Sequence, residues 1–542
     1  MLIYRLLLVG ILSRGLSLSQ VLEESTEQRH SRSVVNMDEL LKVEDDLAGN
    51  LEKYKEQLSH RAETIRWGIH QMKEMLRKRK SFWNNPFITY SLIRHMQADW
   101  LMWQEYLKKP VGLEQLIFMQ SRNLSMPREH DFMDAADGVT RMQGTYQLLA
   151  SDIANGLLDR VQYNSSLAAI DCLELGRDMI QQNYLPSAEQ WILAGIEAYD
   201  RPVPQMEMQL LRGPKKADLY NILGQVRAEL ENYVGAFQAY QMALKESPHD
   251  LKIYQEYQAF EKGLLTSPEK RPDTFKQDEE DEAYVREQLP NCCSGRCEVP
   301  QKLRKLYCLY NRVTSPFLRL APIKTEILSI EPFVVILHDM VSKKEGALIR
   351  SSSKKHLLPS AIASVDAPKE EYQVASSRTS KSVSFPNDFN NATLKISERL
   401  EEATGLDMFH TEYFQITNYG LGGFFETHID TLLSNETRFN GTRDRIATAL
   451  FYLNDVPQGG GTHFPKLNLT VFPKAGSVLF WYNLDFKGND VMNTLHTGCP
   501  VIVGSKWVIS KWISDMGQEL KRPCIESISN VKYLNSAKKL LI

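Results

Sequence analysis

Apolar residues near the start of the chain recur at intervals of three and four. Two heptad series interleave there, Leu40, Leu47 and Tyr54 in one and Leu51, Leu58, Ile65 and Met72 in the other. This spacing predicts a helix-rich region over residues 35–110 that carries a coiled-coil seam. An amphipathic helix packed on its own domain would show the same pattern, but the length of the series favours self-association.

The helical pattern continues over residues 145–260 as a weak internal repeat. The two copies are "LGRDMIQQNYLPSAEQWILAGIEAY" from Leu175 and "LGQVRAELENYVGAFQAYQMALKESP" from Leu223. Their shared Leu-Gly, Tyr and Ala positions are typical of tetratricopeptide (TPR) helix pairs, which stack to leave a concave face. Tyrosines that could line this face and bind a polyproline-II peptide are Tyr184, Tyr220, Tyr233 and Tyr240. Packing within the helix pairs is the alternative role for each of them.

The chain changes character after a charged, proline-containing linker at residues 264–288 and the cysteine-rich stretch behind it. From residue 328, β-rich runs such as "EPFVVILHDM", "RIATALFYL" and "SVLFWYNL" are separated by Gly, Pro and Asn. Several short strands of this kind predict a sandwich or jelly roll rather than alternating strands and helices. One helix, "NATLKISERLEEATG", is expected to cover a sheet.

Composition and the N-terminus narrow the class of protein. Of the 542 residues, 43% are hydrophobic and 24% charged, as in folded soluble domains, and the net charge of −3 gives no argument for nucleic-acid binding. Arg5 precedes an apolar run at residues 6–12, and small residues follow, so we expect a secretory signal cleaved before Gln20. The run is too short to span a bilayer, and we expect no membrane span elsewhere.

Cysteines and sequons agree with passage through an oxidising lumen. The seven cysteines are Cys172, Cys292, Cys293, Cys297, Cys308, Cys499 and Cys524. Sequons for glycosylation occur at Asn123, Asn164, Asn391, Asn435, Asn440 and Asn468. The C-terminal "KKLLI" carries no KDEL-type retrieval signal, so retention in the endoplasmic reticulum would require a partner.

The stretch "FFETHIDTL" places a histidine and an aspartate two residues apart, at His428 and Asp430. On a strand, such side chains share one face and can reach one metal ion. A third ligand must come from downstream, where His463 and His496 are the candidates. His496 precedes a strong strand that contains Lys506, a lysine among apolar neighbours that needs an anionic partner.

Two histidines and one carboxylate leave three coordination positions of a metal ion open, as in non-haem Fe(II) oxygenases. Two of these positions suit the 2-oxo acid of 2-oxoglutarate, and the third suits O2. The distal carboxylate of 2-oxoglutarate then needs a cation, which Lys506 would supply.

With these residues in place, the chain resembles the animal collagen prolyl 4-hydroxylase α subunits over nearly its whole length after the signal. The stretches that carry the resemblance are "ITNYGLGGFFETHID", "RIATALFYLNDVPQGGGTHFPKLNLTVFPKAGSVLFWYNL", "LHTGCPVIVGSKWVISKWI" and "GQELKRPC". The resemblance implies that Fe(II) is held by His428, Asp430 and His496. The positions implied to bind 2-oxoglutarate are Lys506, Tyr419 and Thr462. Arg445 and Trp512 match peptide-contacting positions, with an ion-paired arginine and a core tryptophan as the structural alternatives.

Three residues depart from the family pattern. Phe425 replaces the usual tyrosine, Thr427 the usual proline, and Ser514 a histidine that assists 2-oxoglutarate handling. They put catalytic efficiency in question but remove no metal ligand. His463 follows Thr462 directly, and we expect it to face away and not to be a ligand.

The resemblance also implies a disulfide between Cys499 and Cys524. Cys308 is expected to pair with one of three upstream cysteines, Cys292, Cys293 or Cys297. Zinc is an alternative for this cluster, but the oxidising lumen and the lack of two well-spaced pairs favour disulfides. Cys172 lies in a predicted helix and is expected to be a buried thiol.

The fold class is therefore multidomain α + β. The predicted parts are a signal peptide at residues 1–19, a helical coiled-coil dimerisation domain at 20–144, a TPR-like peptide-substrate-binding domain at 145–260, a linker with a cysteine-rich segment at 261–327, a jelly-roll Fe(II)/2-oxoglutarate dioxygenase domain at 328–524 and a tail at 525–542.

The resemblance implies the catalytic α subunit of a procollagen-proline 4-dioxygenase. Such an enzyme hydroxylates prolines in collagen-like X-Pro-Gly sequences, consumes O2 and 2-oxoglutarate, and releases succinate and CO2. It implies ascorbate as a further cofactor, the endoplasmic reticulum lumen as the location, and an α2β2 tetramer with protein disulfide isomerase as the β subunit. Two alternatives stay open: a non-catalytic chaperone for proline-rich chains with a degenerate dioxygenase domain, and a 2-oxoglutarate enzyme that acts on another residue such as lysine.

Overall fold

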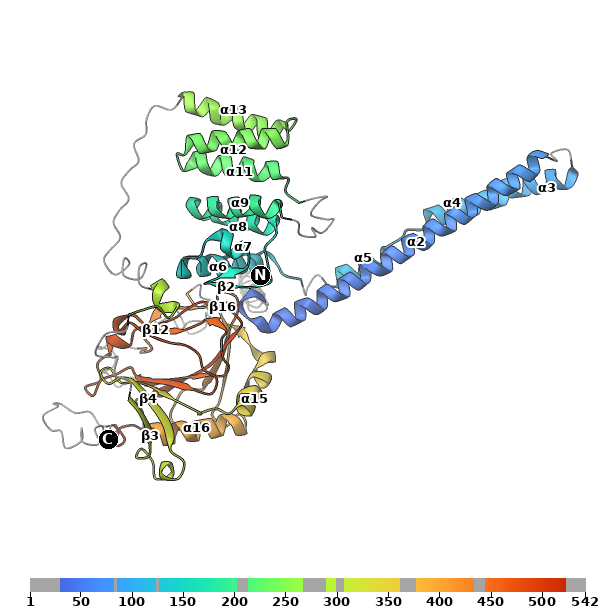
Figure 1. Cartoon of the computed structure of the whole chain (residues 1–542). Coiled ribbons are helices and arrows are strands. Elements are labelled where there is room, and N and C mark those ends of the chain that lie inside the picture. The colour runs from blue at the N-terminus through green and yellow to red at the C-terminus, as the bar shows by residue number, and fades with distance from the viewer. Residues whose placement is uncertain are drawn as a thin grey trace, which may run out of the picture. The chain divides into compact units, whose positions relative to one another are not determined.

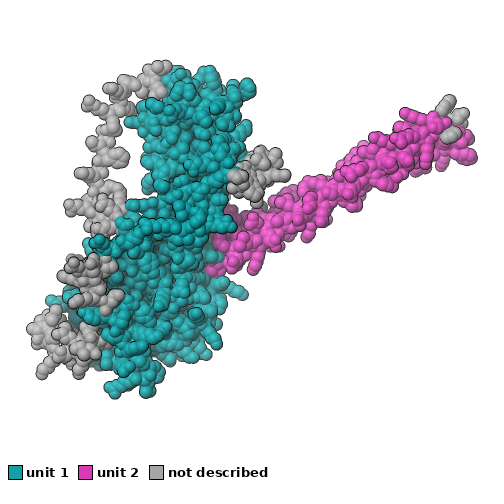
Figure 2. Space-filling view, in the orientation of Figure 1, with its two compact units in different colours: residues 1–34, 129–542 teal, residues 35–128 magenta. Residues whose placement is uncertain are grey.

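A computed structural model describes the chain at residues 30–81, 85–122, 126–201, 213–266, 289–298, 307–360, 377–432 and 444–522 (Figure 1). The predicted signal peptide and C-terminal tail lie outside these residues. The chain forms two compact units, residues 35–128 in one and residues 1–34 with 129–542 in the other (Figure 2). No helix in the described ranges combines the length and apolar character needed to cross a membrane.

The smaller unit is a helical hairpin in which one long helix is covered by a broken returning segment. Its elements are α2 (Met37–Ser81), α3 (Pro86–Arg94), the π-helical η3 (His95–Asp99), α4 (Trp100–Lys108) and α5 (Leu113–Ser121). The Tyr54 ring, from the first heptad series, packs against Gly112 inside the hairpin. Leu51 and Leu58 of the second series are 56% and 42% exposed. The hairpin therefore uses one apolar stripe internally and leaves part of the other uncovered.

The larger unit begins with short N-terminal turns and a stack of helices. The elements are η1 (His30–Arg32), η2 (Val34–Asn36), which ends just past the division between the units, α6 (Glu129–Tyr146), α7 (Ala150–Ala154), the hairpin β1 (Leu157–Leu158) and β2 (Val161–Gln162), α8 (Ala169–Gln181), α9 (Leu185–Tyr199), α11 (Lys216–Glu229), α12 (Tyr233–Glu246) and α13 (Leu251–Thr266). Helices α8, α9, α11 and α12 pack in succession as layers (Figure 1). Helix α6 groups with this unit, although the sequence placed it in the first helical domain.

The Leu-Gly positions of the sequence repeat are contact points in this stack. A Cβ atom on Gly176 would lie 3.0 Å from Ile192, and one on Gly224 would lie 2.9 Å from the Tyr240 ring. Both are closer than side chains ordinarily approach, so glycine is what lets the paired helices pack together. The buried side chains around them, Trp191 and Leu219 among them, form one apolar core.

The C-terminal half of the larger unit is rich in β-strands. The strands are β3 (Tyr307–Asn311), β4 (Ile323–Ser329), β5 (Val334–Leu337), β6 (Leu358–Pro359), β7 (Lys381–Phe385), β8 (Phe414–Tyr419), β9 (Phe425–His428), β10 (Arg445–Tyr452), β11 (Gln458–Gly459), β12 (Thr462–Phe464), β13 (Leu469–Val471), β14 (Val478–Tyr482), β15 (His496–Gly498), β16 (Val501–Val503) and β17 (Lys506–Ser514). One sheet has nine strands in the order β3-β4-β5-β14-β10-β17-β8-β7-β6. A second has four, in the order β13-β12-β15-β9, and β11 pairs with β16.

The two larger sheets share one apolar core. It joins Trp481 and Val508 of the nine-stranded sheet to Phe464 and Leu469 of the four-stranded sheet. Alternation along β17 places Lys506, Val508, Ser510 and Trp512 on the same face, toward a pocket in this region. The sheet interior therefore holds both the core and the site.

Helices α15 (Lys343–Ser353) and α16 (Asn391–Thr404) lie along the strands (Figure 1). The predicted helix at "NATLKISERLEEATG" is confirmed as α16. The Asn390 side chain accepts hydrogen bonds from the first backbone N–H groups, and Gly405 ends the helix with a φ of 72°. Ile396 and Leu400 are fully buried, so α16 presents an apolar face to the domain. Ion pairing between Arg399 and Glu345 joins α16 to α15.

Candidate metal centre

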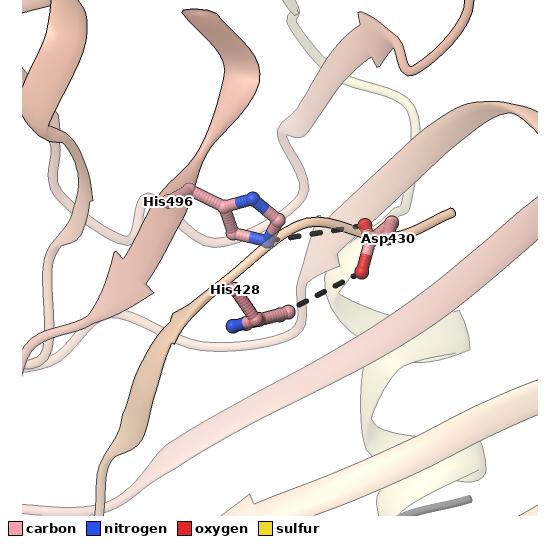
Figure 3. A group of neighbouring side chains, drawn as sticks. All are labelled: His428, Asp430 and His496. Carbon is pink, nitrogen blue, oxygen red and sulfur yellow. Dashed lines mark ion pairs between the residues drawn. The ribbon is translucent and has the colours of Figure 1, made fainter. Parts of the chain in front are cut away.

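Two strands of the four-stranded sheet bring the predicted ligands together. His428 ends β9, and His496 opens the neighbouring antiparallel strand β15 directly opposite it. Asp430 follows two residues after His428, where the chain has left the strand, and its carboxylate turns toward both imidazole rings (Figure 3). One ligand atom from each of the three lies within 4.8 Å of the others, so a single ion fits between them.

Backbone carbonyls fix which ring nitrogen faces the ion. His428 Nδ1 lies 2.6 Å from the carbonyl oxygen of Glu426, and His496 Nδ1 lies 3.0 Å from that of Thr494. A carbonyl only accepts, so each Nδ1 donates a proton and each Nε2 keeps its lone pair. The two Nε2 atoms lie 3.6 Å and 3.8 Å from the Asp430 carboxylate oxygens. Two neutral imidazoles and one carboxylate are the donor set that suits Fe(II).

Burial sets the charge state of these ligands. Removal from water and, to a smaller extent, the neighbouring His496 together lower the pKa of His428 to about 3. Burial alone would raise the pKa of Asp430, but the two histidines and further hydrogen bonding outweigh it and lower that pKa. The aspartate is therefore ionised and His428 neutral at physiological pH, as metal binding requires.

A polar relay from the nine-stranded sheet orients the carboxylate. Thr448 Oγ1 donates a hydrogen bond of 2.7 Å to Asp430 Oδ2, and Asn483 Nδ2 donates one of 2.9 Å to Thr448 Oγ1. Sequence reasoning missed both residues. In the sequence, Thr448 is marked only as a polar residue within the mostly apolar strand β10. Its role becomes clear in the fold, where β10 lies next to Asp430.

Lys506 lies in the same pocket as the triad. The residues that line this pocket are Arg378, Tyr419, Phe425, His428, Asp430, Thr448, Leu450, Thr462, Trp481, His496, Gly498, Lys506, Val508, Ser510 and Trp512. Burial lowers the pKa of Lys506 to about 7. Its Nζ atom lies 5.5 Å from the Tyr419 ring centre, and in the described part of the chain no carboxylate pairs with it. The pocket thus holds a lysine amine without an ionic partner among the described residues, and an anionic ligand would stabilise its protonated form.

Two further predicted residues, Tyr419 and Thr462, line the pocket beside Lys506. Tyr419 is the cross-strand partner of Lys506 on β8. Thr462 Oγ1 lies 2.9 Å from the hydroxyl of Tyr452, which is fully buried. By contrast, the ring of His463 on the next position bonds to Thr470 and is absent from the pocket lining.

Arg445 and Trp512 stack on each other at 3.9 Å from guanidinium to ring centre. Trp512 lines the pocket, and its indole N–H has no hydrogen-bond partner within the described ranges of the chain. Arg445 forms a two-point ion pair with Glu412 and donates to the backbone carbonyl of Asp430. Arg445 is therefore ion-paired, as in the structural alternative, whereas Trp512 faces the site.

The departures from the family pattern fall in different environments. Phe425 stacks on the His428 ring with 3.7 Å between ring centres, and the Arg378 guanidinium covers it at 4.8 Å. Thr427 is exposed, and the Ser514 hydroxyl bonds to Asp515 outside the pocket lining. Arg378 was not singled out from the sequence, because nothing in "SSRTSKS" distinguishes a pocket arginine from a surface one.

The disulfide prediction for Cys499 is wrong. Cys499 pairs with Cys293, and their Cα atoms lie 5.7 Å apart. Residues 289–298 fold against the loop before β16, which brings Cys293 within the span of a disulfide, a contact that the separation of 206 residues concealed. Cys524 lies outside the described residues.

Cys308 also differs from expectation, because it is a free, exposed thiol on β3. Its expected partners are used elsewhere, Cys293 as above and Cys292 with Cys297. Cys172 is a buried free thiol as predicted, and burial raises its pKa to about 12.

The four tyrosines of the helical stack divide into two groups. Tyr184 and Tyr233 are 57% and 46% exposed and remain candidates for peptide contact. Tyr240 is only 3% exposed and packs between Gly224 and the Phe260 ring, so its prediction as a substrate contact is wrong. Tyr220 is half-buried against the core. Helical periodicity could not separate these groups, because the facing helix decides which tyrosine is covered.

The sequons also fall in different places. Asn164 and Asn391 are exposed and Asn468 is half-buried, whereas Asn123, Asn435 and Asn440 lie outside the described residues.

Comparison with known protein families matches two segments of the chain. Residues 33–160 match a model described as the prolyl 4-hydroxylase α-subunit N-terminal region, and residues 414–514 match the 2OG-Fe(II) oxygenase superfamily. The second match contains the triad and Lys506, so Fe(II) and 2-oxoglutarate are the cofactor and co-substrate of this domain.

Similar proteins cover nearly the whole chain. Prolyl 4-hydroxylase subunit alpha-1 of Caenorhabditis elegans is 30% identical over 521 residues, which is 91% of this chain and 90% of the relative. The subunit alpha-1 of Homo sapiens is 28% identical over 516 residues, 91% of this chain and 95% of the relative. A solved structure, the viral collagen prolyl hydroxylase of Paramecium Bursaria Chlorella virus-1 with 2OG, matches 33% of this chain and 95% of its own at 23% identity and a TM-score of 0.28. The chain belongs to the prolyl 4-hydroxylase α-subunit family.

Proposed function

We propose that this chain is the catalytic α subunit of a procollagen-proline 4-dioxygenase that hydroxylates prolines in collagen-like X-Pro-Gly sequences. One observation carries the proposal: the triad of His428, Asp430 and His496 and the uncompensated Lys506 line a single pocket. The triad fits Fe(II), and the lysine fits a dicarboxylate whose other end reaches the metal. A structural metal site would need neither the lysine nor the pocket.

Several residues of the pocket besides the triad have a definable task in this reaction. When bound, the iron activates O2 at the expense of 2-oxoglutarate, which is converted to succinate and CO2. Lys506 neutralises the distal carboxylate of 2-oxoglutarate, and Tyr419 and Thr462 border that end of the pocket. Trp512 offers an apolar wall to the proline ring of the substrate. The buried aromatic lining keeps water from the reacting atoms.

The finer architecture is proposed on the same basis. The two packed antiparallel sheets are those of a double-stranded β-helix, or jelly roll, and the layered helix pairs are TPR-like. In this interpretation the helical stack holds proline-rich chain through exposed aromatic rings such as Tyr184 and Tyr233. The partly uncovered stripe with Leu51 and Leu58 supports self-association through a coiled coil.

Assembly and location follow from family membership as proposals. We propose an α2β2 tetramer in the endoplasmic reticulum lumen, with protein disulfide isomerase as the β subunit and ascorbate restoring iron oxidised in unproductive turnovers. The disulfides at Cys292–Cys297 and Cys293–Cys499 support an oxidising compartment. The exposed Asn164 and Asn391 are candidate glycosylation sites there.

The test is co-expression with a protein disulfide isomerase, followed by incubation with a (Pro-Pro-Gly)n peptide, Fe(II), 2-oxoglutarate and ascorbate. We expect mass spectrometry to find one added oxygen on proline, and His428→Ala to abolish it. Absence of oxidation together with absence of succinate formation would contradict the enzyme and favour the chaperone alternative. Succinate formation without proline oxidation would point to another peptide, which lysine-containing collagen-like peptides would test next.

A further inference from the structure

Helix α6 joins the helical stack to the metal centre. One side of α6 contributes Ala136 and Val139 to the core around Trp191, and Gln143 accepts a hydrogen bond from the Trp191 indole. An adjacent stripe of the same helix contributes Met142 and Tyr146 to a cluster in the β-rich half, and Val139 packs against both clusters. Tyr146 donates a hydrogen bond to the carbonyl of Pro500, next to Cys499. Figure 1 shows α6 at the junction of helices and strands.

The contact continues onto the loop at residues 420–424, which leads directly into β9. A Cβ atom on Gly138 would lie 2.8 Å from the carbonyl oxygen of Leu421, and one on Gly422 would lie 2.2 Å from that of Gly138. The two backbones therefore touch, and only glycine permits it on either side. A close backbone approach of this kind fixes the loop against the helix.

Arg141 of α6 fastens this loop with its side chain. Its guanidinium donates to the carbonyl of Gly422 at 3.0 Å and to Thr379 Oγ1 at 3.3 Å, and it covers the Phe424 ring at 4.1 Å. These contacts belong to two separate segments, residues 377–380 and 420–424. One arginine thus holds both segments at once, a task for which a planar multidentate group is suited.

The two segments carry the support of His428. Thr379 and Phe424 exchange hydrogen bonds, and the backbones of Arg378 and Phe425 pair as an isolated antiparallel β-bridge. The Arg378 guanidinium lies over the Phe425 ring, and the His428 ring also stacks on Phe425. A shift of either segment would therefore move the surface against which the metal ligand rests.

We propose that Arg141 is a positioning residue for the metal centre, and that α6 thereby belongs to the frame of the active site. The residue touches no metal ligand and acts through the loop, Phe425 and the segment with Arg378. The inference deepens the proposed function and rests on it, because it assigns the helical region a part in building the iron site.

The test measures metal affinity of the full-length chain, co-expressed with protein disulfide isomerase, by titration with Co(II) in the absence of substrate. Arg141→Met should raise the Co(II) dissociation constant by about 3- to 10-fold. This is below the roughly 10- to 100-fold effect of residues that bond directly to metal ligands, because Arg141 acts through intervening residues. Arg141→Lys should restore part of the affinity, because it keeps one cation near the Gly422 carbonyl. Arg177→Met is the matched control, since Arg177 is an exposed arginine of α8 that pairs with Glu174.

A second pair of variants keeps the test decisive if Arg141→Met is poorly folded. Gly422→Ala and Gly488→Ala introduce the same methyl group at positive φ, 56° and 82°. Among the described residues, only the methyl group at position 422 would lie within 4 Å of a neighbouring atom. We expect Gly422→Ala to bind Co(II) more weakly than wild type and Gly488→Ala to bind it as wild type does. Wild-type affinity in folded Arg141→Met and Gly422→Ala, even with lowered melting temperatures, would overturn the inference. A wild-type chain that binds no Co(II) would overturn the iron site itself, and with it the proposed function.

Discussion

At the residue scale, the site depends on polar side chains placed inside apolar elements. Thr448 stands in a buried stretch of β10, where a hydroxyl is stable only if it is hydrogen-bonded. The Thr448 hydroxyl donates a hydrogen bond to the ligand carboxylate of Asp430 and accepts one from Asn483. It is therefore satisfied both as a donor and as an acceptor. These hydrogen bonds fix the orientation of the Asp430 carboxylate in the metal-free protein.

Replacing Thr448 by valine tests this relay. The substitution keeps the shape of the side chain and removes the hydrogen bond to Asp430, so metal affinity should fall by about 10-fold or more. Co(II) titration of the purified chain would measure it. Thr470→Val, at a hydrogen-bonded strand threonine away from the triad, is the matched control and should bind as wild type. Equal losses in both variants would contradict a specific role for Thr448.

Lys506 leads to a prediction about pH. Burial lowers its pKa to about 7 in the free protein, so above that pH the binding of a dicarboxylate must take up a proton. The dissociation constant of 2-oxoglutarate, measured with Mn(II) in place of iron, should then rise about tenfold per pH unit above about pH 7. Lys506→Arg stays charged at every accessible pH and should lose this slope. The same slope in both proteins would contradict the assignment.

The same lysine also affects stability, with a defined sign. Between about pH 7 and 10.5 the unfolded chain binds more protons at this position than the folded chain does. The destabilising effect of the buried charge is therefore complete below about pH 7 and diminishes as the pH rises through this window.

At the element scale, short strands and the loops next to them position the metal ligands. The antiparallel register of β15 and β9 places His496 opposite His428, and the following loop carries Cys499 and the turn into β16. The cross-link from Cys293 to Cys499 ties this loop to residues 289–298. The connection that follows the ligand strand β15 is thus anchored.

Disulfide mapping tests the anchor directly. Proteolysis without reduction followed by mass spectrometry should find a peptide that joins Cys293 to Cys499, and Cys293→Ser should lower the free energy of unfolding by about 2–5 kcal/mol. Urea denaturation would measure the latter, with Cys172→Ser as a control for loss of a buried sulfur. A peptide that joins Cys499 to Cys524 would contradict the pairing described above.

At the scale of the whole molecule, the helical hairpin of residues 35–128 forms a unit apart from the catalytic one. Its long helix α2 leaves Leu51 and Leu58 exposed although both belong to a heptad series. An apolar stripe of this kind is stable in water when another helix covers it, and a second copy of the chain is the partner we propose.

Charge on this stripe should therefore separate the copies. Leu51→Glu with Leu58→Glu removes apolar burial worth about 3–6 kcal/mol for two leucines and adds like charges, so the dimer should dissociate. Light scattering after size-exclusion chromatography would measure the mass. The control carries the same added charge at two exposed positions on another face of α2, Ser59→Glu and His70→Glu, and should leave the mass unchanged. Unchanged mass in both variants would contradict self-association through this stripe.

Local patterns were sufficient for much of this protein. The H-x-D spacing, the distal histidine and Lys506 ten residues later could be recognised in the sequence as one set of candidate ligands. Strand alternation suggested that His428 and Asp430 share a face, although Asp430 lies just past the end of β9 and a bend turns its carboxylate toward the histidines. The helix at α16 followed from its capping residues and apolar face. Periods of two and about 3.6 residues are properties of the backbone itself, so they can be interpreted without knowing what packs where.

What depended on the tertiary structure were contacts between segments distant in sequence. Four such contacts are the disulfide partner of Cys499, the burial of Tyr240, the hydrogen bond from Thr448 to Asp430 and the hydrogen bond from Arg141 to the loop before β9. Each joins elements whose proximity cannot be inferred from local sequence patterns. A side chain's neighbours across a core follow from global packing, to which every element contributes. The sequence by itself therefore determined which chemistry the chain can carry, and the fold decided which residues hold that chemistry in place.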